Sequence, residues 1–472
     1  MFFDIPRRQP ALFLALSALI GSSSFLFWES PWNILFPAFW IAILISLRAW
    51  GPLIILPISA VYSFWFCSPP QQAVFSPTTI QSCTATKFGK TFLYRGTLSS
   101  IPCNVYWSGP EAKRPLANCS YKIDSTLLPG RSPRTYQLKP HKHTQWQAIP
   151  YTWSLAEWRY QSKEQFKSIA ESHLHNPRNA HFLTALLTGD IDDSRLRYDF
   201  SRLGLQHLLA VSGFHFALVA ALFYILCGLF LSNRKTLWVV AIALTAYFLF
   251  VGPGPSAMRG WLTAELWILG KLLYRKVDAI NILGFVMLCE LALNPTISAQ
   301  IGFQLSFLSC AAILSFYPAI RALLLRYIPK RSPQQLRQLT HPSHYGYILS
   351  STLRESISLG LAVNIALVPL LLFHFHEFPL CSIFYNLFIP FLTTLAFTCF
   401  GLAMLLPLIG YPLFSLANLL TTQLLQFTSY PIPAWDYSIT ATWIPAWAIP
   451  LYLFVLFGIA FALREKESLV LN

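Results

Sequence analysis

The chain has 472 residues, of which 55% are hydrophobic and only 11% are charged. Soluble globular domains carry roughly 25% charged residues, so this composition excludes a soluble fold of comparable length. The formal net charge of +15 is shared between one polar stretch, residues 67–204, and short loops, where positive charge reports membrane orientation.

The apolar runs are continuous rather than alternating, which disfavours a transmembrane β-barrel and predicts a polytopic α-helical membrane protein. If about half of the residues span lipid, at about 20 residues per helix, the chain has room for roughly twelve transmembrane helices. The 38 Phe, 20 Tyr and 15 Trp suit lipid contact and interfacial belts.

Three apolar runs predict three N-terminal transmembrane helices within residues 1–66: 11–28, 33–47 and 51–66. Arg7, Arg8 and Arg48 flank these runs, and the positive-inside rule places them in the cytoplasm. The third run then leads outside. We interpret the first run as a helix rather than a cleaved signal peptide because no small-x-small cleavage site follows it.

Residues 67–150 predict a small extracytoplasmic β domain. Short runs rich in Thr, Tyr, Val and Trp are separated by Pro, Gly and Asn, which favours a compact five-stranded barrel. In an oxidising compartment its cysteines could form up to two disulfides in three connectivities, or remain free thiols. These disulfide candidates are Cys67, Cys83, Cys103 and Cys119.

Residues 151–204 predict amphipathic helices at the membrane surface. Residues 155–174 are polar and amphipathic, and residues 180–188 form a second helical run that is closed by Gly189. The acidic turn 190–193 lacks the spacing of a calcium loop, so we expect it to cap the next helix rather than to bind a metal ion.

Residues 205–463 predict nine further transmembrane helices: 206–231, 237–251, 259–274, 279–293, 298–320, 357–373, 380–400, 402–428 and 443–463. Residues 464–472 predict a cytoplasmic tail. If the spans alternate, the Lys and Arg clusters after the first, third, fifth and last of these runs all fall in the cytoplasm. The chain therefore has both termini inside. The assignment of transmembrane helices is least certain for the two runs around Phe400, where no charge marks the turn between them. The run 259–274 has the features of a re-entrant segment.

Residues 204–215 place two histidines and a serine within an otherwise apolar span. On an unbroken helix His207, Ser212 and His215 share one broad face, whereas a break at Ser212 and Gly213 would expose backbone groups to a cavity. The simpler alternative is hydrogen bonding between packed helices. A nucleophilic role for Ser212 is weak, because no carboxylate at a telling spacing orients the imidazole of His215.

Arg259 follows a rigid, helix-breaking loop on the predicted outer side. It could meet an anion from outside or extend to the interface, and Glu290 lies at a depth where it could pair with Arg259. His374 and His376 lie at a predicted helix end and do not indicate zinc. Because the sequence has no nucleotide-binding fingerprint, we expect no cofactor, and any energy for transport comes from elsewhere.

Basic and aromatic residues alternate in the β domain, the combination that binds single strands through phosphate contacts and stacking. The alternative is a soluble face beside anionic lipid. The DNA-binding candidates are Lys87, Lys90, Arg95, Tyr94, Trp107, Tyr121 and Lys122.

Several linked motifs resemble those of ComEC-type competence proteins over residues 180–400. They are Leu186-Leu187-Thr188-Gly189-Asp190, the stretch 204–215, Ser256-Ala257-Met258-Arg259-Gly260, Asn294-Pro295, and Gly302-Phe303-Gln304-Leu305-Ser306-Phe307. The core-motif positions that the resemblance carries over are Asp190, His207, Ser212, Gly213, His215, Arg259, Gln304 and Ser306.

The resemblance implies a multi-pass protein of the bacterial cytoplasmic membrane with an OB-like outer barrel and passage of single-stranded DNA through its core. It implies membrane lipids, an outer DNA receptor and a cytoplasmic ATP-driven motor as partners. Many relatives carry a C-terminal metallo-β-lactamase-like domain, which this sequence lacks, so we expect no nuclease activity here; a separate nuclease is possible.

The sequence therefore predicts a channel for DNA uptake rather than an enzyme. One alternative is a transporter of another anionic polymer or a lipid-linked precursor. A weaker alternative is an intramembrane hydrolase.

Overall fold

The computed structural model describes residues 9–26, 32–66, 74–86, 89–98, 101–130, 136–141, 145–191, 193–337, 340–406, 410–429, 437–441 and 443–470. They form two compact units. The first contains Met1–Tyr198, His207–Phe303 and Thr394–Leu425, and the second contains Asp199–Gln206, Gln304–Thr393 and Gln426–Asn472. The protein is predominantly helical.

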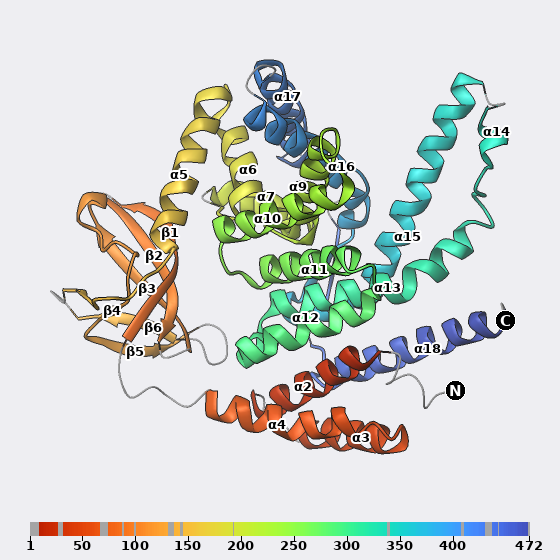
Figure 1. Ribbon diagram of the computed structural model, residues 1–472, viewed down its shortest axis with the longest axis horizontal. Coiled ribbons are helices and arrows are strands. Elements are labelled where there is room, and N and C mark those ends of the chain that lie inside the picture. The colour runs from red at the N-terminus through yellow and green to blue at the C-terminus, as the bar shows by residue number, and fades with distance from the viewer. Residues whose placement is uncertain are drawn as a thin grey trace. The chain divides into compact units, whose positions relative to one another are not determined.

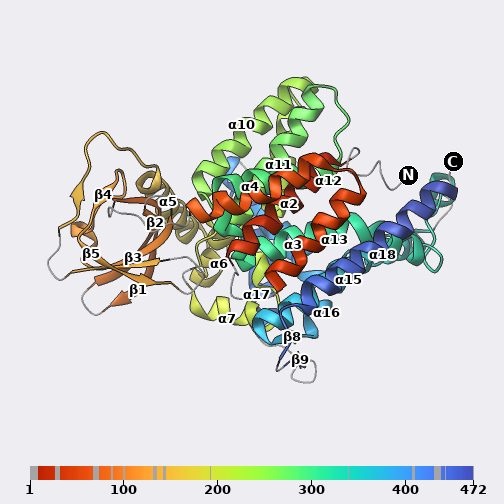
Figure 2. The same cartoon turned by 90° about the horizontal axis from the view of Figure 1, so that it is seen from below.

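The first unit begins with three apolar helices that lie side by side in both views (Figures 1 and 2): α2 (Pro10–Leu26), α3 (Trp32–Ser46) and α4 (Trp50–Phe66). Gly21 lets α2 and α4 approach closely, since a Cβ there would lie 2.1 Å from Ser59 Oγ. The Trp40 indole donates a hydrogen bond to Ser17 Oγ at 2.9 Å, which ties α3 to α2.

A seven-stranded sheet with the strand order β5-β6-β3-β2-β1-β4-β7 follows. The strands are β1 (Val74–Thr86), β2 (Gly89–Leu98), β3 (Ile101–Gly109), β4 (Tyr121–Lys122), β5 (Ser125–Pro129), β6 (Tyr136–Pro140) and β7 (Gln147–Ala148), and a 3₁₀ turn, η2 (Glu111–Lys113), precedes β4. The described residues thus form seven strands rather than the expected compact five-stranded barrel. The sheet is a half-barrel with β5 and β7 at its edges, and a parallel β3–β6 pair extends it.

One face of this sheet packs against helix α5 (Ala156–His173). The alternation of the strands places Phe92, Tyr94 and Val105 on that face, where none is exposed to solvent. Ala156 and Tyr160 of α5 complete the same core.

The rest of the first unit consists mainly of short and medium helices. They are α6 (Pro177–Thr188), α7 (Ser194–Arg202), α8 (Gln206–Leu209), α9 (Gly213–Gly228), α10 (Asn233–Val251), α11 (Pro255–Leu272), α12 (Ala279–Leu293) and η3 (Pro295–Ala299), of which α7 and α8 cross into the second unit. Local signals set these bounds. The Asn176 side chain caps α6 by accepting the Arg178 N–H, and Gly189 ends α6 at φ +77°.

The second unit is built around α13 (Ile301–Leu324) and α15 (His341–Phe375), with the short α14 (Pro333–Arg337) between them. The remaining elements are β8 (Glu377–Pro379), α16 (Cys381–Leu405), α17 (Gly410–Ser429), β9 (Ser438–Thr440) and α18 (Ala448–Val470), and α13, α16 and α17 each cross between the units. The helix expected at 357–373 begins 16 residues earlier, at His341. The single run expected at 402–428 is divided between α16 and α17.

Four of the described helical segments are long and apolar enough to cross a membrane: Asn233–Val251, Ile301–Leu324, Pro342–Phe375 and Cys381–Leu405. Six shorter apolar helices of 10–17 residues accompany them: Pro10–Ser24, Ile34–Ser46, Trp50–Phe66, Gly213–Gly228, Ala279–Leu293 and Ala448–Ala460. The helices of the described residues thus have membrane character. Their length and composition alone do not confirm the expected twelve transmembrane helices.

Candidate functional site

The stretch 206–216 is interrupted, because α8 ends at Leu209 and α9 begins at Gly213. Ser212 is the N-cap of α9 in an extended conformation, and its backbone N–H donates to Nδ1 of His215 at 3.2 Å. The His215 side chain is buried, with its ring edge against Phe397. Of the two expected arrangements, the broken helix is the one present, and exposed His207 does not share a continuous helical face with His215.

This geometry makes His215 a capping residue. Ser212 Oγ lies 3.3 Å from the same Nδ1 that accepts the Ser212 backbone N–H. Because that nitrogen already holds one hydrogen bond, it would have to release it to act as a base toward the hydroxyl. The arrangement favours the structural alternative over a serine nucleophile.

A close glycine contact joins α9 to α11. A Cβ on Gly260 would lie 3.0 Å from the Gly213 Cα and 2.8 Å from a ring carbon of Phe216, so no larger residue fits without displacement. A Cβ on Gly213 would have its nearest neighbour at 3.9 Å. The motif glycine Gly260 therefore sets how closely the two helices approach.

Arg259 lies next to this contact and is buried, with only 5% of its surface exposed. Its guanidinium lies 3.4 Å from the carboxylate of Glu290, and it also donates to Ser256 Oγ at 3.1 Å and to the Gly302 carbonyl at 3.0 Å. It also stacks over the Phe303 ring. The guanidinium is therefore enclosed by protein groups, and its contact with an anion from outside stays a prediction.

Two separate sequence motifs, 256–260 and 302–307, therefore meet at one cation together with Glu290. The pairing with Glu290, which the sequence left open, is present, and Glu290 Oε1 has no hydrogen-bond partner among the described residues. A buried pair of this kind is costly to desolvate, so the arrangement requires both partners.

Asp190 of the acidic turn pairs with Lys163 of α5 at 2.9 Å. Lys163 also donates to the Val251 carbonyl at 3.0 Å, and Arg159 donates to the Leu249 carbonyl at 2.7 Å. These carbonyls belong to the last turn of α10, which has no intrahelical donors for them. Two cations of α5 thus donate hydrogen bonds to the terminal carbonyls of α10, and positive charge at a helix C-terminus is stabilising.

The rest of the acidic turn caps a helix as expected. Asp193 Oδ1 accepts the N–H groups of Arg195 and Leu196 at the start of α7. Asp192 lies outside the described residues.

In the second unit Gln304 and His374 are hydrogen-bonded through Oε1 and Nε2 at 3.0 Å. Ser306 lies on α13, half-buried, and His376 ends α15 with φ +60°. Within the described part of the chain, no group of three or more His, Cys, Asp or Glu residues is arranged to hold a metal ion.

The aromatic DNA-binding candidates of the β domain lie mostly in its core. Tyr94 and Tyr121 are 0% and 6% exposed, and their hydroxyls donate to the carbonyls of Pro115 and Leu116. Trp107 is half-buried against Phe92. These rings are not available for stacking on bases, because the sheet alternation turns them toward α5.

The opposite face of the sheet carries a different polar set. Arg95 is paired in register with Asn104, and both lie on the face that bears Tyr106, which is 46% exposed. Lys139 lies on the same face through the β3–β6 register and is exposed. We call Arg95, Asn104, Tyr106 and Lys139 the outer sheet face. Tyr106 and Lys139 belong to the alternating basic and aromatic residues of the β domain, although not to the DNA-binding candidates chosen from them. Strict two-residue alternation is the signal that separates them from the core.

The remaining basic candidates are dispersed. Lys90 lies 3.7 Å from Glu111, and Lys122 is exposed on β4. Lys87 lies outside the described residues.

Arg114, a further cation of this domain, forms a buried ion pair with Glu157 of α5 at 2.6 Å. Burial raises the pKa of Glu157, but the hydrogen bonds from Arg114 and the Ala117 N–H outweigh it and hold that pKa below its usual value. The Arg114 guanidinium also stacks over the Tyr160 ring at 4.6 Å. This pair fixes α5 to the sheet.

For the described cysteines of the β domain, the structure shows free thiols, one of the two alternatives that the sequence left open. Cys103 and Cys119 are both free thiols, and Cys103 is buried in the core. Burial raises the pKa of the Cys103 thiol to about 12, which leaves it protonated and unreactive. Cys67 and the side chain of Cys83 lie outside the described residues.

Comparison with known proteins gives one family match. Residues 186–466 match the family model described as Competence protein. Over 223 residues the chain is 30% identical to ComE operon protein 3 of Bacillus subtilis (strain 168), which covers 46% of this chain and 25% of that relative. The aligned part thus spans about a quarter of the relative's length. No solved structure matches.

Proposed function

The chain belongs to the Competence protein family, and from this premise we propose that it is a channel for uptake of single-stranded DNA across the bacterial cytoplasmic membrane. The observation that carries the proposal is the outer sheet face. It combines two cations, an amide and an exposed aromatic ring on the side of the sheet that α5 does not cover. Phosphates, base edges and base planes are the groups that such a surface binds.

We also propose twelve spans with both termini in the cytoplasm. The spans are α2, α3, α4, α9, α10, α11, α12, α13, α15, α16, α17 and α18. Two contacts support this topology. Strand β8 follows α15 and pairs with β9, which precedes α18, so an even number of spans lies between them. The outer helix α5 binds the last carbonyls of α10, which requires that α10 ends outside.

The irregular backbone at 210–212 supports a polar interior. Non-helical backbone at membrane depth is stable only where protein or a water-filled cavity satisfies its polar groups. The buried Arg259–Glu290 pair obeys the same constraint. Together these groups give a translocating polyanion a route that avoids lipid.

An external DNA receptor, a cytoplasmic ATP-driven motor and a separate nuclease complete the proposal as partners. A transporter of another anionic polymer or of a lipid-linked precursor would use the same outer sheet face, so the experiment has to separate these substrates.

The test measures strand binding and uptake by the full chain. Binding of a fluorescent single-stranded oligonucleotide to protein in zwitterionic nanodiscs is followed as a function of salt. We expect Arg95→Gln/Lys139→Gln to lower the slope of log K against log [salt] by about 1.4, because each lost phosphate contact removes about 0.7. The matched control, Lys90→Gln/Lys113→Gln, removes the same charge away from this face.

The same variants are then introduced into a strain that lacks the gene, and uptake of labelled DNA past the cytoplasmic membrane is scored. Loss of uptake on deletion, with partial loss in the outer-face variant, supports the channel. Unchanged uptake on deletion, or equal affinity for any polyanion of the same length, contradicts it.

A further inference from the structure

Helix α15 is longer than a membrane crossing needs. Its 35 residues extend for about 52 Å at 1.5 Å per residue, whereas the hydrocarbon core is about 30 Å thick. The apolar part, residues 356–375, covers that thickness by itself. Residues 341–355 therefore stand about 22 Å beyond it, together with α14 and the segment that follows α13 (Figure 1). We call the described residues 322–337 and 340–354 the arm.

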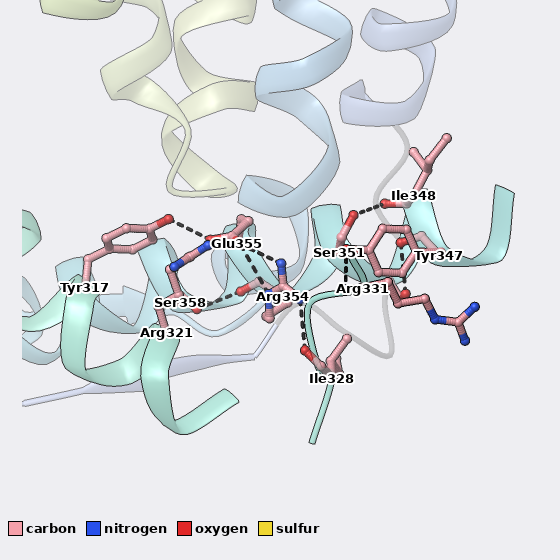
Figure 3. Close-up of polar contacts among 11 residues, drawn as sticks. Tyr317, Arg321, Ile328, Arg331, Tyr347, Ile348, Ser351, Arg354, Glu355 and Ser358 are labelled. Carbon is pink, nitrogen blue, oxygen red and sulfur yellow. Dashed lines mark hydrogen bonds and ion pairs between the residues drawn. The ribbon is translucent and has the colours of Figure 1, made fainter. Parts of the chain in front are cut away.

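A polar cluster centred on Glu355 fixes the base of the arm (Figure 3). The Glu355 carboxylate accepts hydrogen bonds from Tyr317 at 2.6 Å, Arg321 at 2.8 Å and Arg354 at 2.7 Å. Arg354 is almost fully buried and also donates to the Ile328 carbonyl at 2.9 Å. This cluster ties the segment after α13 to α15, and it neutralises part of the charge of Arg321 and Arg354.

The attachment continues along the arm. Tyr347, eight residues before Glu355 on α15, accepts the Arg331 backbone N–H at 3.2 Å, and its ring stacks with the Arg331 guanidinium at 5.6 Å. Residues 328–331 thus run alongside α15 for about 10 Å rather than as a loose loop. The cations of this segment are consequently held at fixed heights above the membrane.

The charged residues of the arm are all basic, and those beyond its base lie between residues 326 and 337. Residues 322–354 contain no Asp or Glu, and four exposed cations lie along them: Arg326, Lys330, Arg331 and Arg337. Two tyrosines beside these cations are largely exposed, Tyr327 at 77% and Tyr345 at 69%. Cations spaced along a rigid support, with exposed aromatic rings between them, match the phosphates and bases of a single strand.

We propose that the arm binds the single strand as it emerges on the cytoplasmic side of the membrane, with Arg326, Lys330, Arg331 and Arg337 on the phosphates and Tyr327 and Tyr345 stacking on bases. This inference rests on the proposed function and adds a second strand-binding site to it. The strand is favoured over anionic lipid because the headgroup layer is only about 5–8 Å deep on each side. The contact of Arg331 with Tyr347 places Lys330 and Arg331 about 10 Å beyond the base of the arm, and therefore beyond that layer and beyond the Debye length of about 8 Å.

The experiment compares two variants with the same change in charge. The arm variant is Arg326→Gln/Lys330→Gln/Arg331→Gln/Arg337→Gln. The matched control neutralises four exposed cations of the two other loops on the same predicted side: Arg234→Gln/Lys235→Gln/Arg275→Gln/Lys276→Gln. Both are made in the full chain, reconstituted in zwitterionic nanodiscs and titrated with a fluorescent oligothymidylate over a range of salt. Cysteine accessibility in cells checks that each variant keeps its topology.

We expect the arm variant to lower the salt slope by up to about 2.8, which corresponds to four lost phosphate contacts on a single strand, and the loop control to leave it unchanged. Tyr345→Ala should weaken binding without changing the slope, because stacking releases no counterions. Equal slopes for wild type and the arm variant, or an equal fall in both charge variants, overturn the proposal.

Two further outcomes separate the alternatives. If the arm variant loses only its association with anionic lipid vesicles, the arm is a lipid contact and the inference is wrong. If the arm variant binds as wild type does but the outer-face variant loses binding, the proposed function stands while the arm proposal fails. A wild-type protein that binds no strand overturns both.

Discussion

The Arg259 guanidinium of α11 lies 3.4 Å from the Glu290 carboxylate of α12, and neither side chain is more than 6% exposed. Their positions in the chain are 31 residues apart. The pair also holds the start of α13 through the Gly302 carbonyl, so three helices of the family core depend on one cation.

Replacement of Arg259 by methionine should destabilise this core by about 3–5 kcal/mol, because it leaves a buried carboxylate without its partner. The measurement is thermal unfolding of the detergent-solubilised protein, followed by tryptophan fluorescence. The double variant Arg259→Met/Glu290→Met removes both charges and should recover most of the loss. A double variant that is less stable than the single one would contradict this account of the pair.

The two facing glycines of α9 and α11 should respond differently to alanine. Gly260→Ala places a methyl group 2.8 Å from the Phe216 ring and should cost about 1–3 kcal/mol as an overpacking change. Gly213→Ala meets nothing closer than 3.9 Å and serves as the matched control. The measurement is the unfolding temperature of each variant relative to wild type. Equal decreases in the two variants would show that the close approach at Gly260 does not cause the destabilisation.

Ser212 should behave as a helix cap rather than as a nucleophile. Ser212→Ala should cost about 0.5–2 kcal/mol of stability, the usual range for a lost N-cap. A fluorophosphonate probe should fail to label the wild-type protein, and DNA uptake should persist in the variant. Labelling that disappears in Ser212→Ala would instead favour the hydrolase alternative.

The Arg114–Glu157 pair should make the attachment of α5 to the β domain sensitive to acid. Since the pKa of Glu157 lies below its usual value in the folded protein, the stabilisation is present above the ordinary carboxyl range and is lost as pH falls through the lowered pKa. Glu157→Gln should cost about 2 kcal/mol at neutral pH, as expected for lost charged hydrogen bonds. The difference from wild type should shrink toward pH 3.

Limited proteolysis of the 145–177 region and melting curves between pH 3 and pH 7 test this dependence. The control is Glu111→Gln, whose half-exposed pair with Lys90 should contribute about 0.5 kcal/mol or less. A constant difference between Glu157→Gln and wild type across this range would be the contrary result.

Several features were accessible from sequence because they depend on local chemistry. The polar amphipathic stretch 155–174 corresponds to α5, and Gly189 ends α6 in the left-handed conformation that glycine favours. The family itself was recognised from linked motifs in order, and the family match over residues 186–466 confirms it.

Other predictions failed because they needed the position of one element relative to another. Tyr94 and Tyr121 were assigned to a binding surface, yet a one-residue change along a strand moves a side chain to the other face, and only the packing of α5 shows which face is covered. The number of strands was decided in the same way, and so was the choice that the sequence left open between disulfides and free thiols at Cys103 and Cys119.

Composition and the spacing of apolar runs by themselves indicated a helical membrane protein interrupted by one long polar stretch, since the cost of placing polar groups in lipid acts on every residue. Tertiary structure alone decided that Arg259 meets Glu290, that Glu355 fixes the arm, and that Arg95 and Tyr106 share a solvent-facing surface. The Arg259–Glu290 pairing joins residues distant in sequence, and its free energy arises only when packing excludes water from both partners.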